Sequence, residues 1–139
     1  MRASRILAYC WACPNTCLGL ILLPLTWFGQ GNASVVAGVC EIHGPAIAFI
    51  LARCTLLRGG ALALTLGHVV IGRDQNALDL TREHERVHVR QYERWGPFFL
   101  PAYLVFSIVA RLGGSDAYRD NRFEREAFGR DGTGKGFRV

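Results

Sequence analysis

His84-Glu85-Arg86-Val87-His88 is the stretch of this chain that decides the fold. On an α-helix, residues four apart lie about 40° apart around the axis and one turn along it, so His84 and His88 project from one face. Two imidazole nitrogens placed in this way can reach one Zn²⁺ ion at about 2.0–2.1 Å. Glu85 then lies beside the metal without ligating it and can act as general base toward a water molecule. The alternative is a surface helix whose His and Glu are simply solvated.

The residues around this motif predict that it lies on a helix. Between Ala77 and Trp95 there is no Pro or Gly, and Asn76 or Asp79 can cap the start of the helix. Gly96-Pro97 is expected to end it, because Gly favours a helix C-terminus and Pro restricts the residue before it.

A zinc site needs at least a third protein ligand, and the C-terminal part of the chain offers one in Glu124-Arg125-Glu126-Ala127. Positions 124 and 127 share a helix face, and Ala127 is small enough to let this helix approach the metal helix. Glu126 lies about 200° around the helix from Glu124, so both cannot face the metal. We expect Glu124 to be the ligand; an acidic surface helix is the alternative.

HExxH followed by ExxA resembles the gluzincin metallopeptidases. The resemblance implies that His84, His88 and Glu124 bind Zn²⁺ and that Glu85 is the catalytic residue. Over about residues 61–128, the chain looks like small bacterial membrane-associated proteins of the minigluzincin type. The expected fold is α+β: an N-terminal transmembrane or signal-anchor helix, a sheet of about two or three strands, the HExxH helix, an apolar helix and the C-terminal ExxA helix.

Composition divides the 139 residues into three parts. Residues 1–30 begin with Arg2 and Arg5 and continue with an apolar run from Ile6 to Phe28. About 20 apolar residues span a bilayer, so this part is interpreted as a membrane anchor, with a cleaved signal segment as the alternative. Residues 34–129 are the zinc metallopeptidase-like domain, and the Gly-rich residues 130–139 are expected to be disordered.

The positive charge favours lipid rather than nucleic acid as a partner. The net charge is +5 and comes almost entirely from Arg, without the interleaved aromatic residues of an RNA-binding surface. Arg2 and Arg5 precede the apolar run and no Lys or Arg follows before Arg53, so the positive-inside rule places the domain outside a bacterial inner membrane.

Four arginines, Arg82, Arg86, Arg90 and Arg94, recur every four residues on the helix face opposite the two histidines. Two interpretations stay open: a solvated face partly neutralised by neighbouring Glu residues, or a stripe that lies against phosphate headgroups.

Periodicity predicts the remaining elements. β-Branched and partly alternating residues predict strands at 34–42 and 61–71, and apolar runs predict a short helix at 46–57 and a buried or membrane-dipping helix at 97–112. A strand beside the metal helix could hold an extended substrate by edge pairing.

Several polar residues near these elements could support the site. His68 is interpreted as a packed or capping residue, with support of the metal or of an oxyanion as the alternative. Gln91 could orient a ligand or be an ordinary polar helix residue. Asp120 or Asn121 can cap the last helix, and Asp120 could also hydrogen-bond a ligating His.

The chain has five cysteines. Cys10, Cys13 and Cys17 fall at helical spacing in the apolar run and are interpreted as small apolar residues on one helix face. Cys40 and Cys54 could form a disulfide if the domain is exported.

The sequence therefore predicts a membrane-associated zinc-dependent metallopeptidase that hydrolyses a peptide or protein substrate and contacts membrane lipid. The alternative is a non-catalytic membrane protein with a structural or vestigial zinc site, which Arg86 inside the motif and the short chain favour. A helical membrane adaptor without metal is a third hypothesis. No substrate or oligomeric state is specified by these residues.

Overall fold

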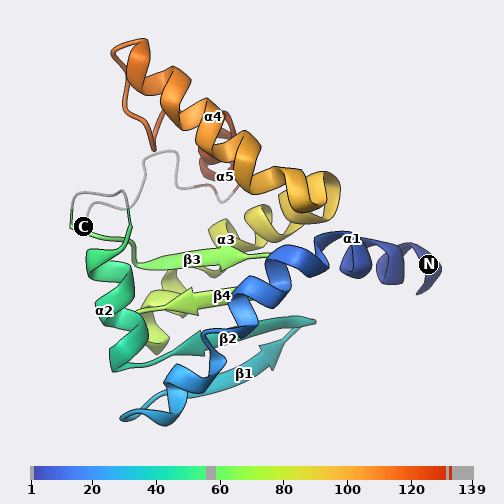
Figure 1. Ribbon diagram of the computed structural model, residues 1–139, viewed down its shortest axis with the longest axis vertical. Coiled ribbons are helices and arrows are strands. Elements are labelled where there is room, and N and C mark those ends of the chain that lie inside the picture. Colours follow the sequence, from blue (N-terminus) through green and yellow to red (C-terminus); the bar gives the residue numbers. More distant parts are fainter. Residues whose placement is uncertain (1, 56–58, 131, 133–139) are drawn as a thin grey trace.

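A four-stranded mixed β-sheet is the central layer of the structure (Figure 1). The computed structural model describes residues 2–55, 59–130 and 132. The strands are β1 (Asn32–Val36), β2 (Val39–His43), β3 (Ala63–Leu66) and β4 (Val69–Gly72). The hairpins β1–β2 and β3–β4 are joined by parallel pairing of β2 with β4, so β1 and β3 are the edge strands of the order β1-β2-β4-β3. The predicted α+β class is confirmed.

Each of the two predicted strands is in fact a hairpin. The run 34–42 turns at Ala37 and Gly38, which have φ angles of 48° and 82°, and the run 61–71 turns at Gly67, with a φ of 63°. Two-residue hairpin turns need such positive φ angles, which Gly adopts without strain. Ala37 and Gly38 occupy the first turn in place of the usual polar residues, and only His68 interrupts the apolar pattern at the second, so the sheet has more strands than predicted.

Helices cover both faces of the sheet. They are α1 (Arg2–Leu20), the 3₁₀ helix η1 (Leu23–Trp27), α2 (Pro45–Arg53), α3 (Gln75–Trp95), the 3₁₀ helix η2 (Gly96–Phe98), α4 (Phe99–Leu112) and α5 (Arg122–Arg130). Successive strand residues point to opposite faces. Val69 and Ile71 therefore pack with residues of η1 and α2 on one face, whereas Val70 packs with Leu78 and Val89 of α3 on the other.

The boundaries of α3 differ slightly from those predicted. The helix begins at Gln75 because Asp74, rather than Asn76 or Asp79, caps it: the Asp74 Oδ1 atom accepts a hydrogen bond of 2.8 Å from the Ala77 N–H. It ends at Gly96, as predicted. The predicted helix 46–57 is shorter and ends at Arg53, and residues 56 and 57 lie outside the described residues, as does almost all of the predicted disordered tail.

Helix α1, the main part of the predicted anchor, packs closely on the rest of the chain. Its Asn15 side chain donates a 2.9 Å hydrogen bond to the carbonyl of Gly96, and the Thr16 hydroxyl accepts one of 3.0 Å from the His68 N–H. A Cβ atom at Gly67 would overlap Thr16, and one at Gly96 would overlap the Trp11 ring. These two glycines therefore permit the close approach of α1.

Among the described residues, two helical segments are long and apolar enough to cross a membrane. They are Ser4–Trp27 and Gln75–Leu112, whose most apolar windows have mean hydropathies of 1.7 and 1.4. Only small shares of these windows, 17% and 11%, are buried inside the protein. Length and composition are thus compatible with the predicted membrane association.

Candidate metal centre

Three buried side chains from α3 and α5 meet at one point. The Nε2 atoms of His84 and His88 are 3.2 Å apart. Glu124 Oε2 lies 3.1 Å from the Nε2 atom of His84, and Glu124 Oε1 lies 3.4 Å from that of His88. The exposed fractions of the three residues are only 3%, 7% and 3%. This group could bind a metal ion.

The spacing of the three donor groups matches a tetrahedral metal site. With metal–ligand bonds of about 2.0–2.1 Å, the ligand atoms of a tetrahedral centre are about 3.3–3.4 Å apart. The separations in the structure, 3.1–3.4 Å, are close to that value. The three side chains leave a fourth position for another ligand. Two imidazoles and one carboxylate suit several divalent transition metals.

The local sequence of α5 explains how Glu124 reaches α3. Asn121, which is fully buried, caps the helix by accepting a 2.9 Å hydrogen bond from the Phe123 N–H. Its side-chain amide also donates to Tyr103 O and to Ser107 Oγ at 2.9 and 2.8 Å, which fixes the start of α5 against α4. Ala127 is fully buried, as expected for the small residue that lets α5 approach α3.

Gln91 orients His88. The Nδ1 atom of His88 is 2.9 Å from Gln91 Oε1. The Gln91 amide nitrogen donates to Phe123 O and to Glu126 Oε2, at 3.1 and 3.0 Å, so its oxygen is the end left to accept. The Nδ1–H of His88 therefore donates to Gln91, which leaves the Nε2 atom of His88 facing Glu124. Glu126 therefore contacts Gln91, which in turn contacts His88, and Glu126 is not a member of the metal-binding group.

Two supporting contacts were not predicted from the sequence. The Tyr103 hydroxyl donates a 2.7 Å hydrogen bond to Glu124 Oε1, and the Thr65 hydroxyl donates one of 2.6 Å to Glu85 Oε2. Tyr103 is one of two hydrogen-bonding side chains in the apolar run 97–110. A polar side chain in such a run was the sequence feature that could have indicated a buried hydrogen bond. Thr65 lies in a strand-like apolar run, where Thr is common for its β-propensity alone.

Glu85 lies on the side of α3 that faces β3. It is 6% exposed, and its negative charge helps to raise the pKa of both His84 and His88. The Glu85 carboxylate therefore lies near the metal-binding group, but Glu85 is not one of the three residues that form the group.

His84, His88 and Glu124 shift each other's pKa. Burial lowers the pKa of His88, but the charge and hydrogen bond of Glu124 outweigh burial and raise it to about 9. The pKa of His84 is also raised, because the hydrogen bond to Glu124 and neighbouring charges outweigh burial. Burial raises the pKa of Glu124, but the charge and hydrogen bonds of the two imidazoles bring it far below its ordinary value of 4.5. Without metal, imidazolium protons hold this group together; a metal ion would replace them.

Arg86, the charged residue inside the motif, faces away from the ligands. Its guanidinium donates to the Val36 carbonyl at 2.6 Å and to Glu41 Oε1 at 3.2 Å. Arg82 binds both oxygens of the same Glu41 carboxylate, at 3.0 and 2.9 Å, and Glu41 is only 3% exposed. Neither interpretation of the arginine stripe describes these two residues, because they join α3 to β2. Arg94 lies 3.6 Å from Glu126, and Arg90 is exposed.

The structure confirms the main interpretation of His68 and contradicts the suggested contact of Asp120 with a ligating histidine. His68 lies in the β3–β4 turn, stacked on Tyr9 with ring centroids 3.9 Å apart and bonded to Glu93 at 3.1 Å, so it is a packed residue. Asp120 does not reach a histidine: its Oδ2 accepts a 2.8 Å hydrogen bond from the Asp116 N–H.

All five cysteines are free, so Cys40 and Cys54 do not form the suggested disulfide. The Sγ atoms of Cys13 and Cys17 are 3.7 Å apart on exposed positions of α1. No cysteine belongs to the metal-binding group.

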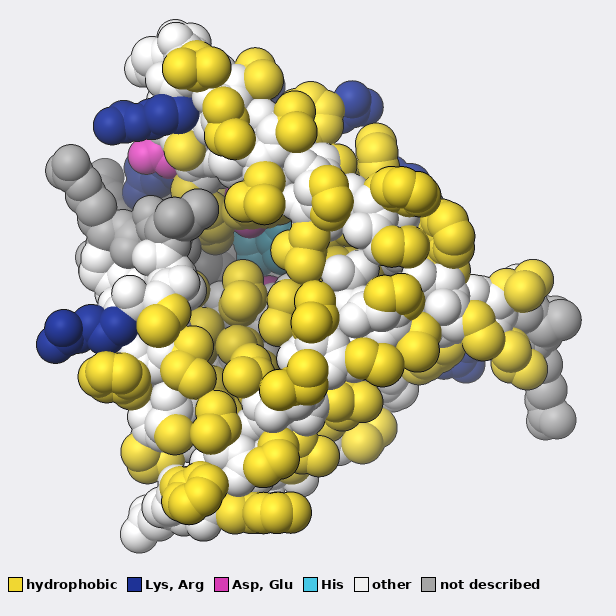
Figure 2. All heavy atoms as spheres, in the orientation of Figure 1, with side chains coloured by type: hydrophobic (Ala, Val, Ile, Leu, Met, Phe, Trp, Pro, Cys, Tyr) yellow, Lys and Arg dark blue, Asp and Glu magenta, His cyan; other side chains and the backbone are white. Residues whose placement is uncertain are grey.

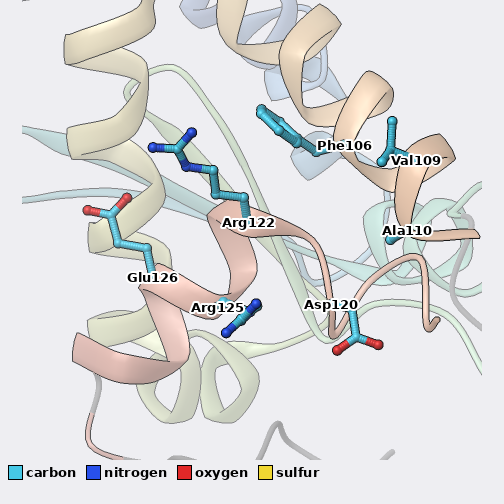
Figure 3. A pocket seen from close by; sticks show the side chains of 7 residues that line it. All are labelled: Phe106, Val109, Ala110, Asp120, Arg122, Arg125 and Glu126. Carbon is cyan, nitrogen blue, oxygen red and sulfur yellow. The ribbon is translucent and has the colours of Figure 1, made fainter. Parts of the chain in front are cut away.

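A pocket of about 550 Å³ lies between α4 and α5 (Figure 3). It is lined by Phe106, Val109 and Ala110 of α4 and by Asp120, Arg122, Arg125 and Glu126. Its lining includes none of His84, His88 and Glu124, so it is separate from the group that could bind a metal ion.

Comparison of the chain with protein-family models, with curated proteins and with solved structures gave no match.

Proposed function

We propose that this chain is a membrane-associated, zinc-dependent hydrolase of peptide or amide bonds, organised like a minimal gluzincin. The observation that carries the proposal is the triangle formed by His84, His88 and Glu124, whose edges of 3.1–3.4 Å suit a tetrahedral ion. A bound zinc ion would supply a Lewis acid that polarises the scissile carbonyl and lowers the pKa of water.

The surrounding residues have distinct roles in this proposal. Glu85 accepts the proton of the attacking water and delivers it to the leaving amine, since its carboxylate lies beside the ligands. The Thr65 hydroxyl holds Glu85 in place through its 2.6 Å hydrogen bond. Thr65 is on the edge strand β3. Its carbonyl accepts a 3.1 Å hydrogen bond from the Tyr92 hydroxyl, so pairing with an extended peptide would use the other residues of this edge. Gln91 and Tyr103 orient two of the ligands.

A second candidate is a non-catalytic membrane protein with a structural zinc site. The burial of all three ligands favours it, because structural metal sites are closed whereas catalytic sites keep an open position. Arg86 no longer supports this candidate, because its side chain is directed to Glu41 and Val36.

Zinc content tests the site itself. Wild-type protein should carry one zinc per chain, and His88→Ala and Glu124→Ala should carry far less. His43→Ala is the matched control, because His43 ends strand β2 outside the metal-binding group. Equal zinc in the wild type, His88→Ala and Glu124→Ala would show that the ligand set is wrong.

Glu85→Gln separates the two candidates. In a hydrolase it should retain zinc but lower the turnover of a peptide mixture by at least about 100-fold, the usual contribution of a general base. Glu83→Gln, at an exposed position of the same helix, should be neutral. A wild-type protein that binds zinc and cleaves no peptide would support the structural site instead.

A further inference from the structure

We propose that one broad face of this protein is embedded in a lipid bilayer and that the metal centre opens onto it. The apolar face consists of the exposed hydrophobic side chains of α1, η1, α2 and α4. Its most exposed members include Leu7, Ile21, Trp27, Phe49, Ile108 and Leu112. The substrates would then be polypeptide segments presented by the membrane, a consequence that rests on the proposed hydrolase function.

The apolar face is continuous and almost free of charge. Figure 2 shows hydrophobic side chains over most of this view, with Lys and Arg at its margins and a few acidic atoms inside the central hollow. The sequence explains this, because no charged residue lies between Arg5 and Glu41 or between Arg94 and Arg111. Apolar surfaces of this extent mark sites of contact with a membrane or another protein.

Helix α4 has its polar side chains inside and its apolar ones outside. Tyr103 bonds to Glu124, and the Ser107 hydroxyl accepts a hydrogen bond from buried Asn121. The outward positions Val105 and Ile108 are each 57% exposed. A helix on a water-exposed surface has the opposite arrangement, with its apolar stripe facing the core. The inverted pattern fits lipid.

Helix α1 is inverted in the same way. Asn15 is 3% exposed and bonds to the Gly96 carbonyl, whereas Ile6 and Leu7 are 62% and 70% exposed. A bilayer provides an apolar environment for all four elements at once, which is why we assign it as the occupant.

Positively charged residues at the margins of the apolar face can bind the phosphate headgroups of lipids. Arg53 is the last residue of α2 and Arg111 lies in the last turn of α4, and both are exposed. Arginine at the end of an embedded helix extends to the interface and binds phosphate.

The metal centre lies directly under α4. The Tyr103 hydroxyl contacts Glu124, and the Phe99 ring centroid is 6.3 Å from that of His88. Figure 2 shows a histidine side chain at the floor of a hollow in the apolar face, beneath α4. His84, His88 and Glu124 are only 3–7% exposed, and α3 covers the opposite face of the sheet, so the hollow is the proposed approach to them from the bilayer.

Liposome flotation with matched variants tests the embedding. Ile108 of α4 and Leu80 of α3 are 57% and 60% exposed, but Leu80 lies on the helix behind the sheet. After detergent removal, wild type and Leu80→Asp should float with vesicles of phosphatidylcholine and phosphatidylglycerol. Ile108→Asp should partition about 100-fold less, because Asp in the centre of a bilayer is strongly disfavoured. Equal flotation of the two variants would overturn the proposal.

Wild-type protein provides a second readout that does not depend on variant folding. Trp11 and Trp27 are 45% and 81% exposed on the apolar face. Their fluorescence should be quenched by phosphatidylcholine brominated on its acyl chains, and Trp27→Phe should reduce the quenching. Unchanged fluorescence in brominated vesicles would overturn the embedding.

Substrate delivery is tested with one peptide in two forms, free in water and joined to an apolar helix in the same vesicles. The zinc-loaded protein should cleave the anchored form at least tenfold faster. Equal rates would overturn the opening toward lipid. If neither form is cleaved, the proposed hydrolase function fails, and flotation and quenching still decide the embedding.

Discussion

Raising the pH should destabilise the metal-free protein, because Glu124 holds His88 in its protonated form. The pKa of His88 rises from an ordinary 6.5 to about 9. Since the folded pKa is the higher one, protonation stabilises the fold fully below pH 6.5, and this stabilisation is lost as the pH rises to about 9. At about 1.4 kcal/mol per pKa unit, the loss is on the order of 3 kcal/mol. His88 is 7% exposed, so solvent screens the pair little.

The pH dependence of stability has the opposite sign for the Glu124 carboxylate. The pKa of Glu124 is lowered below its ordinary 4.5, so its contribution is present above pH 4.5 and is lost as the pH falls further. Metal-free protein should therefore be most stable between about pH 4.5 and 6.5. With bound zinc, the stability should instead increase as the pH rises above 6.5, because the ligands must be deprotonated to bind the ion and the affinity for zinc therefore rises with pH.

Denaturant unfolding in detergent micelles at pH 6.5 and 9, with and without zinc, measures both effects. Between pH 6.5 and 9, the metal-free wild type should lose free energy of unfolding. This loss should be smaller in His88→Ala by about 3 kcal/mol and unchanged in His43→Ala. An identical pH dependence for wild type and His88→Ala would refute the coupling between His88 and Glu124.

Three further variants test individual contacts. Gln91→Leu removes the acceptor for His88 Nδ1 and should weaken zinc binding about 10–100-fold in a chelator competition, with unchanged helix content; undiminished affinity would contradict the orienting role. Asn121→Ala removes the cap of α5 and two further hydrogen bonds, so it should lower the free energy of unfolding by about 2–4 kcal/mol in a urea titration; a change below measurement error would show that α5 is held elsewhere. Arg86→Leu removes one partner of buried Glu41 and should lower that free energy by about 1–3 kcal/mol while zinc content stays at one per chain; loss of zinc would place Arg86 functionally at the metal.

The helical parts of the fold were predictable because their signals are local. Helical periodicity, the absence of Pro and Gly, and Gly96-Pro97 locate α3 to within two residues at its start and at the predicted residue at its end. The hairpins were missed because Ala37-Gly38 is an apolar turn between two β-branched runs, and Gly38 alone does not distinguish a turn from a bulge.

The pairing of His84 and His88 was predictable because residues four apart share a helix face, whereas Glu124 was expected to join them from the resemblance to the ExxA motif. The contacts of Tyr103 with Glu124 and of Thr65 with Glu85 depend on how α4 and β3 pack against α3, which no sequence spacing encodes. The same holds for Arg86: its position on the helix was known, but its partner Glu41 is 45 residues away on another strand.

The zinc K-edge X-ray absorption spectrum of the purified protein is the most direct test of the central claim. It should show nitrogen and oxygen neighbours at about 2.0 Å, two of them with the outer-shell pattern of imidazole, and no sulfur at about 2.3 Å. In Glu124→Gln this coordination should change or the zinc should be lost. Sulfur neighbours, or a spectrum that Glu124→Gln leaves unaltered, would contradict a centre built from His84, His88 and Glu124.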